Sequence, residues 1–110
     1  MSKSKRTKAT EIPYCVKMNV WERDGHLCIF CHKPGLPEAH VVPRSHSGLG
    51  IETNIITVCR PCHNKLDNST KRADMLFFAE RYLKHYYPDW KREDQIYDKW
   101  RWLREQTDMP

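Results

Sequence analysis

The chain lacks any apolar run of membrane-spanning length, and its first ten residues contain no apolar stretch. A membrane-spanning helix takes about 20 apolar residues, and a secretory signal needs an apolar core. The first absence excludes a membrane protein, and the second argues against secretion, so we expect a cytoplasmic protein. Internal repeats and low-complexity tracts are also absent, and 110 residues fit one small domain.

Acidic residues are missing from the first ten positions, which carry most of the net charge of +5. Basic arms of this kind contact nucleic-acid phosphates and make binding depend on salt. The alternative is a terminus that only aids solubility. Under either interpretation we expect residues 1–10 to be disordered. The basic residues concerned are Lys3, Lys5, Arg6 and Lys8.

Five cysteines stand out in a chain this short, which needs a staple because a small core buries little surface. Cys28 with Cys31, and Cys59 with Cys62, form two Cys-x-x-Cys motifs. Disulfides would suit a secreted protein, whereas in a reducing compartment such pairs indicate metal ligands. Four thiolates complete the tetrahedral shell of a structural zinc ion. The alternative is free thiols in the core, which is also where we expect Cys15.

Hydrophobic periodicity and turn residues predict an α+β arrangement in the first two thirds of the chain. A helix is expected over residues 13–24, and strands over 38–42 and 54–58. Residues 44–53 are expected to form the loop between the strands. Pro61 opens a further helix that continues to about Asp67.

The remaining part of the chain is predicted to be helical. An apolar stripe follows Ser69 or Thr70, either of which can cap a helix. Pro88 ends that helix, and Asp89 can cap a second one. The aromatic residues of both helices could stack on bases, but at this spacing we expect core packing. The second stripe consists of Ile96, Tyr97, Trp100 and Leu103.

Three further polar residues lie in or directly after the segment that the cysteine pairs bracket. His40 lies in the first predicted strand, Asn54 begins the second, and His63 lies in the first turn of the following helix. They converge if the strands pair and the helix packs across them. Imidazole and carboxamide groups can bind or orient a divalent metal, and an imidazole can take a proton from water. Asp67, one turn after His63, is either another ligand or a solvated charge.

These motifs together resemble the HNH endonucleases, the ββα-metal finger class. The resemblance covers about residues 21–69. Looser similarity at residues 65–68 and 82–90 points to small phage-encoded HNH proteins. The segments that carry the main resemblance are Cys28-x-x-Cys31, Glu38-Ala39-His40-Val41-Val42-Pro43-Arg44-Ser45, Gly48-x-Gly50-Ile51-x-Thr53-Asn54-Ile55 and Cys59-x-x-Cys62-His63.

The resemblance implies a small zinc-stabilised ββα-metal core with a flanking N-terminal helix and C-terminal helices. We expect a single domain: a basic disordered tail over 1–10, an HNH nuclease core with the zinc site over 11–69 and a helical C-terminal extension of the same domain over 70–110. The four cysteines would bind structural zinc.

The resemblance also implies roles for the inner residues. His40 would be the general base, and His63 would bind a catalytic Mg²⁺ or Mn²⁺. Asn54 would bind that metal or orient the base. The products of DNA hydrolysis would be a 5′ phosphate and a 3′ hydroxyl.

The sequence departs from the family pattern at Ala39, where many members carry an aspartate or histidine that binds the metal. Asp67 or a substrate phosphate would then complete the metal shell, and Glu38 and His46 are further candidates. Arg44, four positions after the expected base, either contacts a phosphate or is an ordinary surface residue.

The sequence therefore predicts a metal-dependent DNA endonuclease that nicks one strand, acting as a monomer or weak dimer. Phage genome processing in the host cytoplasm is one setting for it. The competing hypothesis is an inactive, zinc-stabilised nucleic-acid-binding module, which Ala39 favours. Residues 70–110 could in addition dock a protein partner such as a phage packaging machine.

Overall fold

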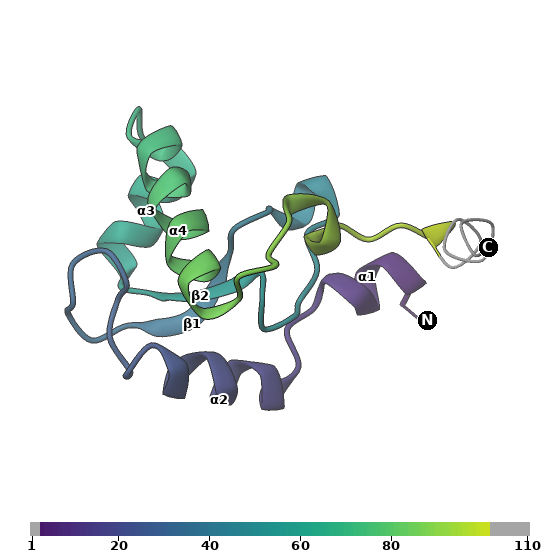
Figure 1. Ribbon diagram of the computed structural model, residues 1–110, viewed down its shortest axis with the longest axis horizontal. Helices are drawn as coiled ribbons and strands as arrows, with labels where there is room; N and C mark the ends of the chain where they lie inside the picture. Colours follow the sequence, from purple (N-terminus) through teal and green to yellow (C-terminus); the bar gives the residue numbers. More distant parts are fainter. Residues whose placement is uncertain (1–2, 102–110) are drawn as a thin grey trace.

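The computed structural model describes residues 3–101, which are arranged around a two-stranded antiparallel hairpin (Figure 1). Strand β1 spans Leu36–His40 and strand β2 spans Ile55–Val58. Helix α3, Arg60–Asn68, follows β2 directly. The predicted α+β class and the order strand, loop, strand, helix are therefore confirmed.

Strand β1 begins two residues earlier than predicted and ends at His40 instead of residue 42. Its pairing with β2 is irregular between Leu36 and Ala39. Pro37 lies there and has no N–H to donate to a neighbouring strand. His40 is paired with Ile55 at the other end, so the imidazole is held at the point where the chain leaves the sheet.

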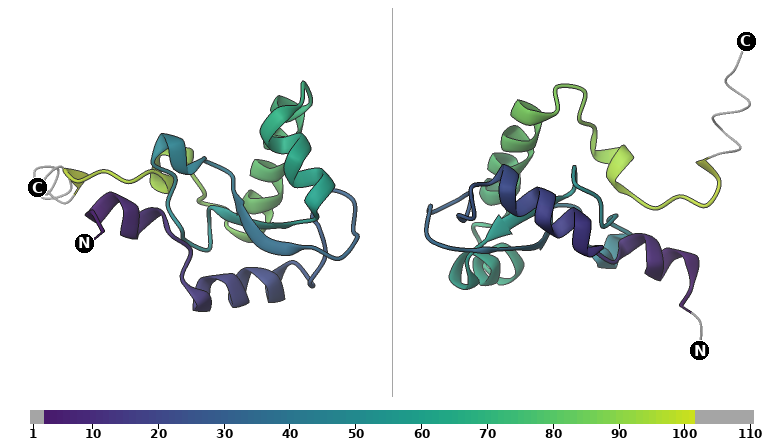
Figure 2. Two further views of the ribbon diagram at one scale, coloured as in Figure 1. Left: turned by 180° about the vertical axis from the view of Figure 1, so that it is seen from behind. Right: turned by 90° about the horizontal axis from the view of Figure 1, so that it is seen from below.

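Helices cover both faces of the hairpin. Helix α2, Tyr14–Arg23, runs along one face, and α3 and α4, Arg72–Tyr86, lie on the other (Figures 1 and 2). Every residue of β2 is buried, as expected for a strand covered on both sides. The core cluster contains Cys28, Ile29, Ala39, Val41, Ile56, Val58, Cys59, Cys62, Leu66, Ala79, Leu83 and Trp90.

A buried ion pair at the end of α2 ties the layers together. Arg23 and Asp24 form two hydrogen bonds, of 2.8 and 3.0 Å. Asp24 also accepts from the Thr57 N–H at 2.9 Å and from the Tyr82 hydroxyl at 2.7 Å. Burial and this carboxylate raise the pKa of Tyr82. The carboxylate therefore joins α2, β2 and α4, and removing it would leave the buried Arg23 guanidinium without its charged partner.

The prediction of a disordered tail is wrong for the residues that the structure describes. Helix α1 spans Lys5–Thr10, and Thr10 is 1% exposed. The Ser4 side chain caps the helix by accepting from the Thr7 N–H at 3.1 Å. Lys3 pairs with Glu11 at 2.6 Å. The charge pattern gave no sign of this because the contacts that hold the helix come from distant residues.

The C-terminal prediction is correct for one helix, whereas the start of the second predicted helix is not α-helical among the described residues up to 100. Helix α4 begins at Arg72, so neither Ser69 nor Thr70 is its cap; the Ser69 hydroxyl instead accepts from the Lys71 N–H at 3.1 Å. After Pro88 the described residues form a short 3₁₀ helix, η2, over Arg92–Gln95, and Arg101, at the edge of the described part, is helical.

The second apolar stripe is not helical within the described residues, because Ile96 is extended and pairs with Gly48 instead. Leu103 lies outside the described residues. The aromatic side chains are divided: Trp90 is buried, whereas Phe77 and Phe78 are exposed.

Two further observations concern helices. Cys15 in α2 is exposed, so the expectation that it is a core residue is wrong.

None of the helices within residues 3–101 combines the length and apolarity needed to cross a bilayer.

Candidate metal centre and active site

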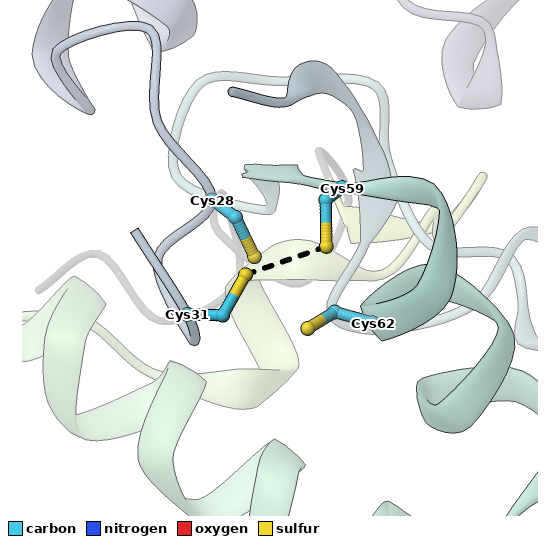
Figure 3. Close-up of side chains that lie close together, drawn as sticks. All are labelled: Cys28, Cys31, Cys59 and Cys62. Carbon is cyan, nitrogen blue, oxygen red and sulfur yellow. Dashed lines mark hydrogen bonds between the residues drawn. The ribbon is translucent and has the colours of Figure 1, made fainter. Parts of the chain in front are cut away.

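The four predicted zinc ligands form one cluster. Cys28 and Cys31 come from the turn after α2, and Cys59 and Cys62 from the start of α3 (Figure 3). All four sulfurs lie within 4.8 Å of one another, and those of Cys31 and Cys59 are 3.5 Å apart. Tetrahedral zinc with Zn–S bonds of about 2.3 Å separates its sulfurs by about 3.8 Å. The cluster therefore has the donors and spacing of a structural zinc site.

The chemistry of the cluster also suits a bound cation. Burial raises the pKa of the Cys62 thiol well above its usual value, and hydrogen bonds from the neighbouring cysteines raise it further. Four thiolates cannot gather in so small a space without a metal ion to offset their charge. The cluster is therefore a metal-binding site of the structural, four-ligand type.

A second site lies between strand β1 and helix α3, the helix that begins at the cluster. His40, His63 and Asp67 line one cavity of about 130 Å³, together with Glu38 and Arg44. His63 Nε2 is 3.6 Å from an Asp67 carboxylate oxygen, as their spacing on a helix allows. The cavity thus brings together the predicted base, two of the predicted metal ligands, His63 and Asp67, and the predicted phosphate contact.

The imidazole of His40 is partly buried and has one protein partner among the described residues. Its Nε2 lies 2.8 Å from the main-chain oxygen of Thr10. Burial lowers the pKa of His40, and the nearby Arg44 and His63 lower it further, while the Thr10 carbonyl acts in the opposite direction. His40 is therefore neutral at neutral pH, the form that can accept a proton.

Asn54 does not line the cavity. Its side chain is fully buried, and its Oδ1 accepts from the Val42 N–H at 2.8 Å. Its Nδ2 donates to the carbonyls of Val42, at 3.1 Å, and Leu49, at 2.8 Å. These bonds close the loop that follows His40. This geometry favours a positioning role for Asn54 and gives no support to its prediction as a metal ligand.

The two further candidate ligands, Glu38 and His46, lie in different parts of the structure. Glu38 lines the cavity, as its position two residues before His40 on a strand suggests. His46 lies in the short 3₁₀ helix η1, Arg44–His46, and does not line the cavity that contains His40. Ala39 is buried in the core, so position 39 contributes no donor.

Sequence reasoning missed Arg72, which also lines the cavity. Within residues 3–101 its guanidinium forms no ion pair. No motif marks this residue, because it reaches the site only through the packing of α4 against α3. A second cavity of about 150 Å³ shares Glu38 and His63 with the first and extends to Arg60.

Comparison with protein families gives one match for this segment. Residues 28–75, somewhat less than half of the chain, match the family model described as HNH endonuclease. The segment belongs to the HNH endonuclease family. Searches of curated proteins and of solved structures returned no match.

The HNH assignment joins the two sites in one unit. The matched segment contains all four cysteines and every predicted catalytic residue, and it ends in the first turn of α4. Family membership makes the protein a phosphodiester hydrolase and implies that DNA is its substrate. Helices α1 and α2 precede the matched segment, so Thr10 lies outside it although it contacts His40.

Proposed function

We propose that this HNH protein is a metal-dependent DNA endonuclease with His40 as its general base. One observation carries the proposal: a single cavity collects His40, His63 and Asp67 together with Arg44 and Arg72. A base, donors for a divalent metal and cations for a phosphate are the groups that phosphodiester hydrolysis needs.

The chemical step uses the neutral imidazole. His40 takes a proton from a water molecule as the water oxygen bonds to phosphorus. The bond between phosphorus and the 3′ oxygen breaks, and the departing oxygen takes a proton from solvent. This order of events leaves a 5′ phosphate and a 3′ hydroxyl. The lowered pKa of His40 supports the role, because the imidazole is already deprotonated at neutral pH.

We assign the catalytic metal to His63 and Asp67, with Glu38 as the third protein donor. One imidazole and two carboxylates suit Mg²⁺ or Mn²⁺, and all three residues line the same cavity. A metal bound there would offset the negative charge of the phosphate and of the departing oxygen. Glu38 thereby supplies the donor that Ala39 lacks.

We assign zinc to the four cysteines. Cys59 is the N-cap of α3, and Cys62 lies in its first turn, directly before His63. Zinc would therefore fix the end of the helix that carries the catalytic ligands. Its role is structural because four cysteines leave no open position for water or substrate.

DNA binding is assigned to the arginines of the cavity and to the basic residues of α1. Lys5 and Lys8 are exposed on that helix, and α1 ends at Thr10, which contacts His40. They can reach phosphates beside the scissile one. Lys3 and Arg6 are already engaged within the protein, by Glu11 and by Ser47, and we expect less from them.

One base and one set of metal donors cut one strand at each binding event, so we expect nicking by a monomer. The test is a supercoiled plasmid with Mg²⁺ or Mn²⁺, beside a His40→Ala variant. Open circles should form before linear DNA, and only with the parent protein. Equal nicking by both proteins would show that His40 is not the base, and linear DNA as the first product would contradict nicking.

The competing proposal is a zinc-stabilised module that binds DNA without cutting it. The buried alanine at position 39 is the observation that favours it. The same plasmid assay decides: DNA binding with no cleavage under any divalent metal would establish the module. The phage setting and a location in the host cytoplasm stay predictions from the sequence resemblance.

A docking role for residues 70–110 has one supporting observation. Phe77 and Phe78 are 62% and 47% exposed on α4, which is unusual for large apolar side chains that lie next to each other. A Phe77→Ser, Phe78→Ser double variant should leave plasmid nicking intact and lose a protein partner in a pull-down. If the double variant loses both nicking and partner binding, the two phenylalanines are needed for folding and not for docking.

A further inference from the structure

The segment formed by residues 3–11, here called the strap, is tied to the loop between the two strands. Arg6 supplies two ties: its Nε donates to Ser47 Oγ at 2.8 Å, and its Nη2 donates to the Arg44 carbonyl at 2.6 Å. Arg44 places its guanidinium nitrogens 3.4 Å from the Thr10 hydroxyl. The end of the strap is thus enclosed by the same loop that lines the cavity.

Gly50 packs its main chain directly against the strap. Its N–H donates to the Ala9 carbonyl at 2.9 Å. A Cβ at position 50 would lie 1.7 Å from the Glu11 main-chain oxygen, far inside any allowed contact. Only glycine lets the strap lie this close, so the strap is packed and not merely resting on the surface.

This packing brings a free carbonyl to His40. The last carbonyls of a helix have no N–H partner inside the helix, and α1 ends at Thr10. The Thr10 oxygen lies 2.8 Å from His40 Nε2. A carbonyl can only accept a hydrogen bond, so Nε2 carries the hydrogen, and a neutral imidazole then has its lone pair on Nδ1. Within residues 3–101, Nδ1 has no protein partner.

We infer that the strap is a working part of the active site. The Thr10 carbonyl holds the His40 imidazole with its hydrogen on Nε2, and Nδ1 is the atom that takes the proton from the attacking water. After the transfer the Nε2–H remains bonded to the same carbonyl. Thr10 is therefore a positioning residue that acts through its main chain. The inference rests on the proposed function, since it names the atom through which the base acts.

The family match does not contain this arrangement. The matched segment begins at residue 28, whereas the strap ends at residue 11. Without the strap, either nitrogen of a neutral His40 could carry the hydrogen, and the imidazole could rotate. Fixing one tautomer and one orientation is what a general base needs from its neighbours.

The test reads the two imidazole nitrogens of His40 directly. Long-range ¹H–¹⁵N NMR spectra are recorded on the zinc-loaded protein without DNA, at a pH where His40 is neutral, and a His40→Gln variant assigns its signals. The parent should show hydrogen on Nε2. In Gly50→Ala, the added Cβ should displace the strap, so the two nitrogens should move toward averaged shifts. Trypsin cleavage at Lys5 and Lys8 reports the displacement.

The matched control is Gly25→Ala. Gly25 has a φ of +65° and open space around it, so the change strains the backbone without touching the strap. In the plasmid assay Gly50→Ala should lower kcat about tenfold or more, with KM for DNA little changed. This loss in kcat is smaller than the roughly 10²–10⁴-fold loss expected when the base is removed. Gly25→Ala should keep the parent's tautomer and its kcat.

Two results would overturn the inference: hydrogen on Nδ1 in the parent, or the same tautomer in the parent and in Gly50→Ala. If Gly50→Ala does not fold, Arg6→Ala is the second variant. It removes two exposed hydrogen bonds of the strap and should give the same change in the His40 tautomer to a smaller extent. An unchanged tautomer in an Arg6→Ala protein that trypsin cleaves more readily would also overturn the inference. The NMR measurement does not depend on DNA cleavage. A protein that cuts no DNA would contradict the proposed function, and the tautomer of His40 could still be measured.

Discussion

Helix α3 supplies residues to two neighbouring sites, the four-cysteine cluster and the His40 cavity, which differ in donors and in exposure. The cluster has four identical donors, and three of them are buried. The cavity mixes imidazoles with carboxylates, and the Asp67 side chain is 58% exposed. The cluster is closed and suited to holding the fold, whereas the cavity is open and suited to a substrate. The difference can be measured, because one metal should control stability and the other only activity.

Loss of the structural metal should have the largest effect. Cys28→Ser should leave the protein unfolded, because zinc contributes about 10–16 kcal/mol in zinc-finger peptides, and small domains are stable by only about 5–15 kcal/mol. Thermal unfolding followed by circular dichroism checks this. By contrast, replacing Asp67 with Asn should abolish metal-dependent nicking and leave the melting temperature unchanged. A folded Cys28→Ser protein without zinc would contradict the assignment.

Removal of the base should affect the cavity alone. His40→Ala should lower kcat by roughly 10²–10⁴-fold with a small change in stability. The matched control is His46→Ala in the loop between the strands, which does not line the His40 cavity and should cut DNA like the parent. Plasmid nicking rates for both proteins, with their unfolding curves, give the comparison. A similar loss of activity for His46→Ala would reinstate it as a metal ligand.

Replacement of Asn54 should lower both stability and activity, since its side chain holds the loop after His40 from inside the core. Asn54→Ala removes three hydrogen bonds, each worth about 0.5–1.5 kcal/mol, so the free energy of unfolding should fall by about 2–4 kcal/mol and nicking should fall with it. The exposed Asn19→Ala is the control for the substitution itself. Denaturant titration and the nicking rate are the measurements. Full activity of a destabilised Asn54→Ala protein would remove its positioning role.

The two arginines of the cavity should weaken DNA binding to a smaller extent. Arg72→Ala and Arg44→Ala should each lower affinity and reduce the slope of log K against log salt by about one. Arg81→Ala, on the exposed side of α4, should leave the slope unchanged. Fluorescence anisotropy with a short duplex over a range of salt concentrations tests all three. An unchanged slope for Arg72→Ala would mean that it faces no phosphate.

The pH dependence should be the mildest effect. Burial lowers the pKa of His40 below its usual 6.5, so kcat/KM should be flat at neutral pH and fall only in acid, where the imidazole gains a proton. Stability should change in the same direction as kcat/KM. Below pH 6.5 the unfolded chain binds this proton more readily than the folded protein, so the free energy of unfolding falls as pH falls. A rate that still rises between pH 7 and 8 would point to a different base.

The sequence allowed the cluster to be predicted completely but the cavity only in part. Paired Cys-x-x-Cys motifs determine their own geometry, because each turn presents two sulfurs whatever surrounds it. His40, His63 and Asp67 were also found, because strand ends and helix spacing bring them together. Arg72 and Thr10 were missed because only tertiary packing places them, and no local pattern records that α1 folds back on a loop some 35 residues later in the chain.

The exposed position of Cys15 has a practical consequence. With a metal held by the other four cysteines, one thiol per chain remains available to a maleimide. The number of dye molecules bound per chain then reports whether the cluster holds its metal. We expect about one dye on a metal-loaded chain, and up to five once the ion is lost and the chain unfolds. Because α2 covers the opposite face of the hairpin from α3 and α4 (Figure 1), a dye at this position can follow DNA binding in real time without touching the cavity.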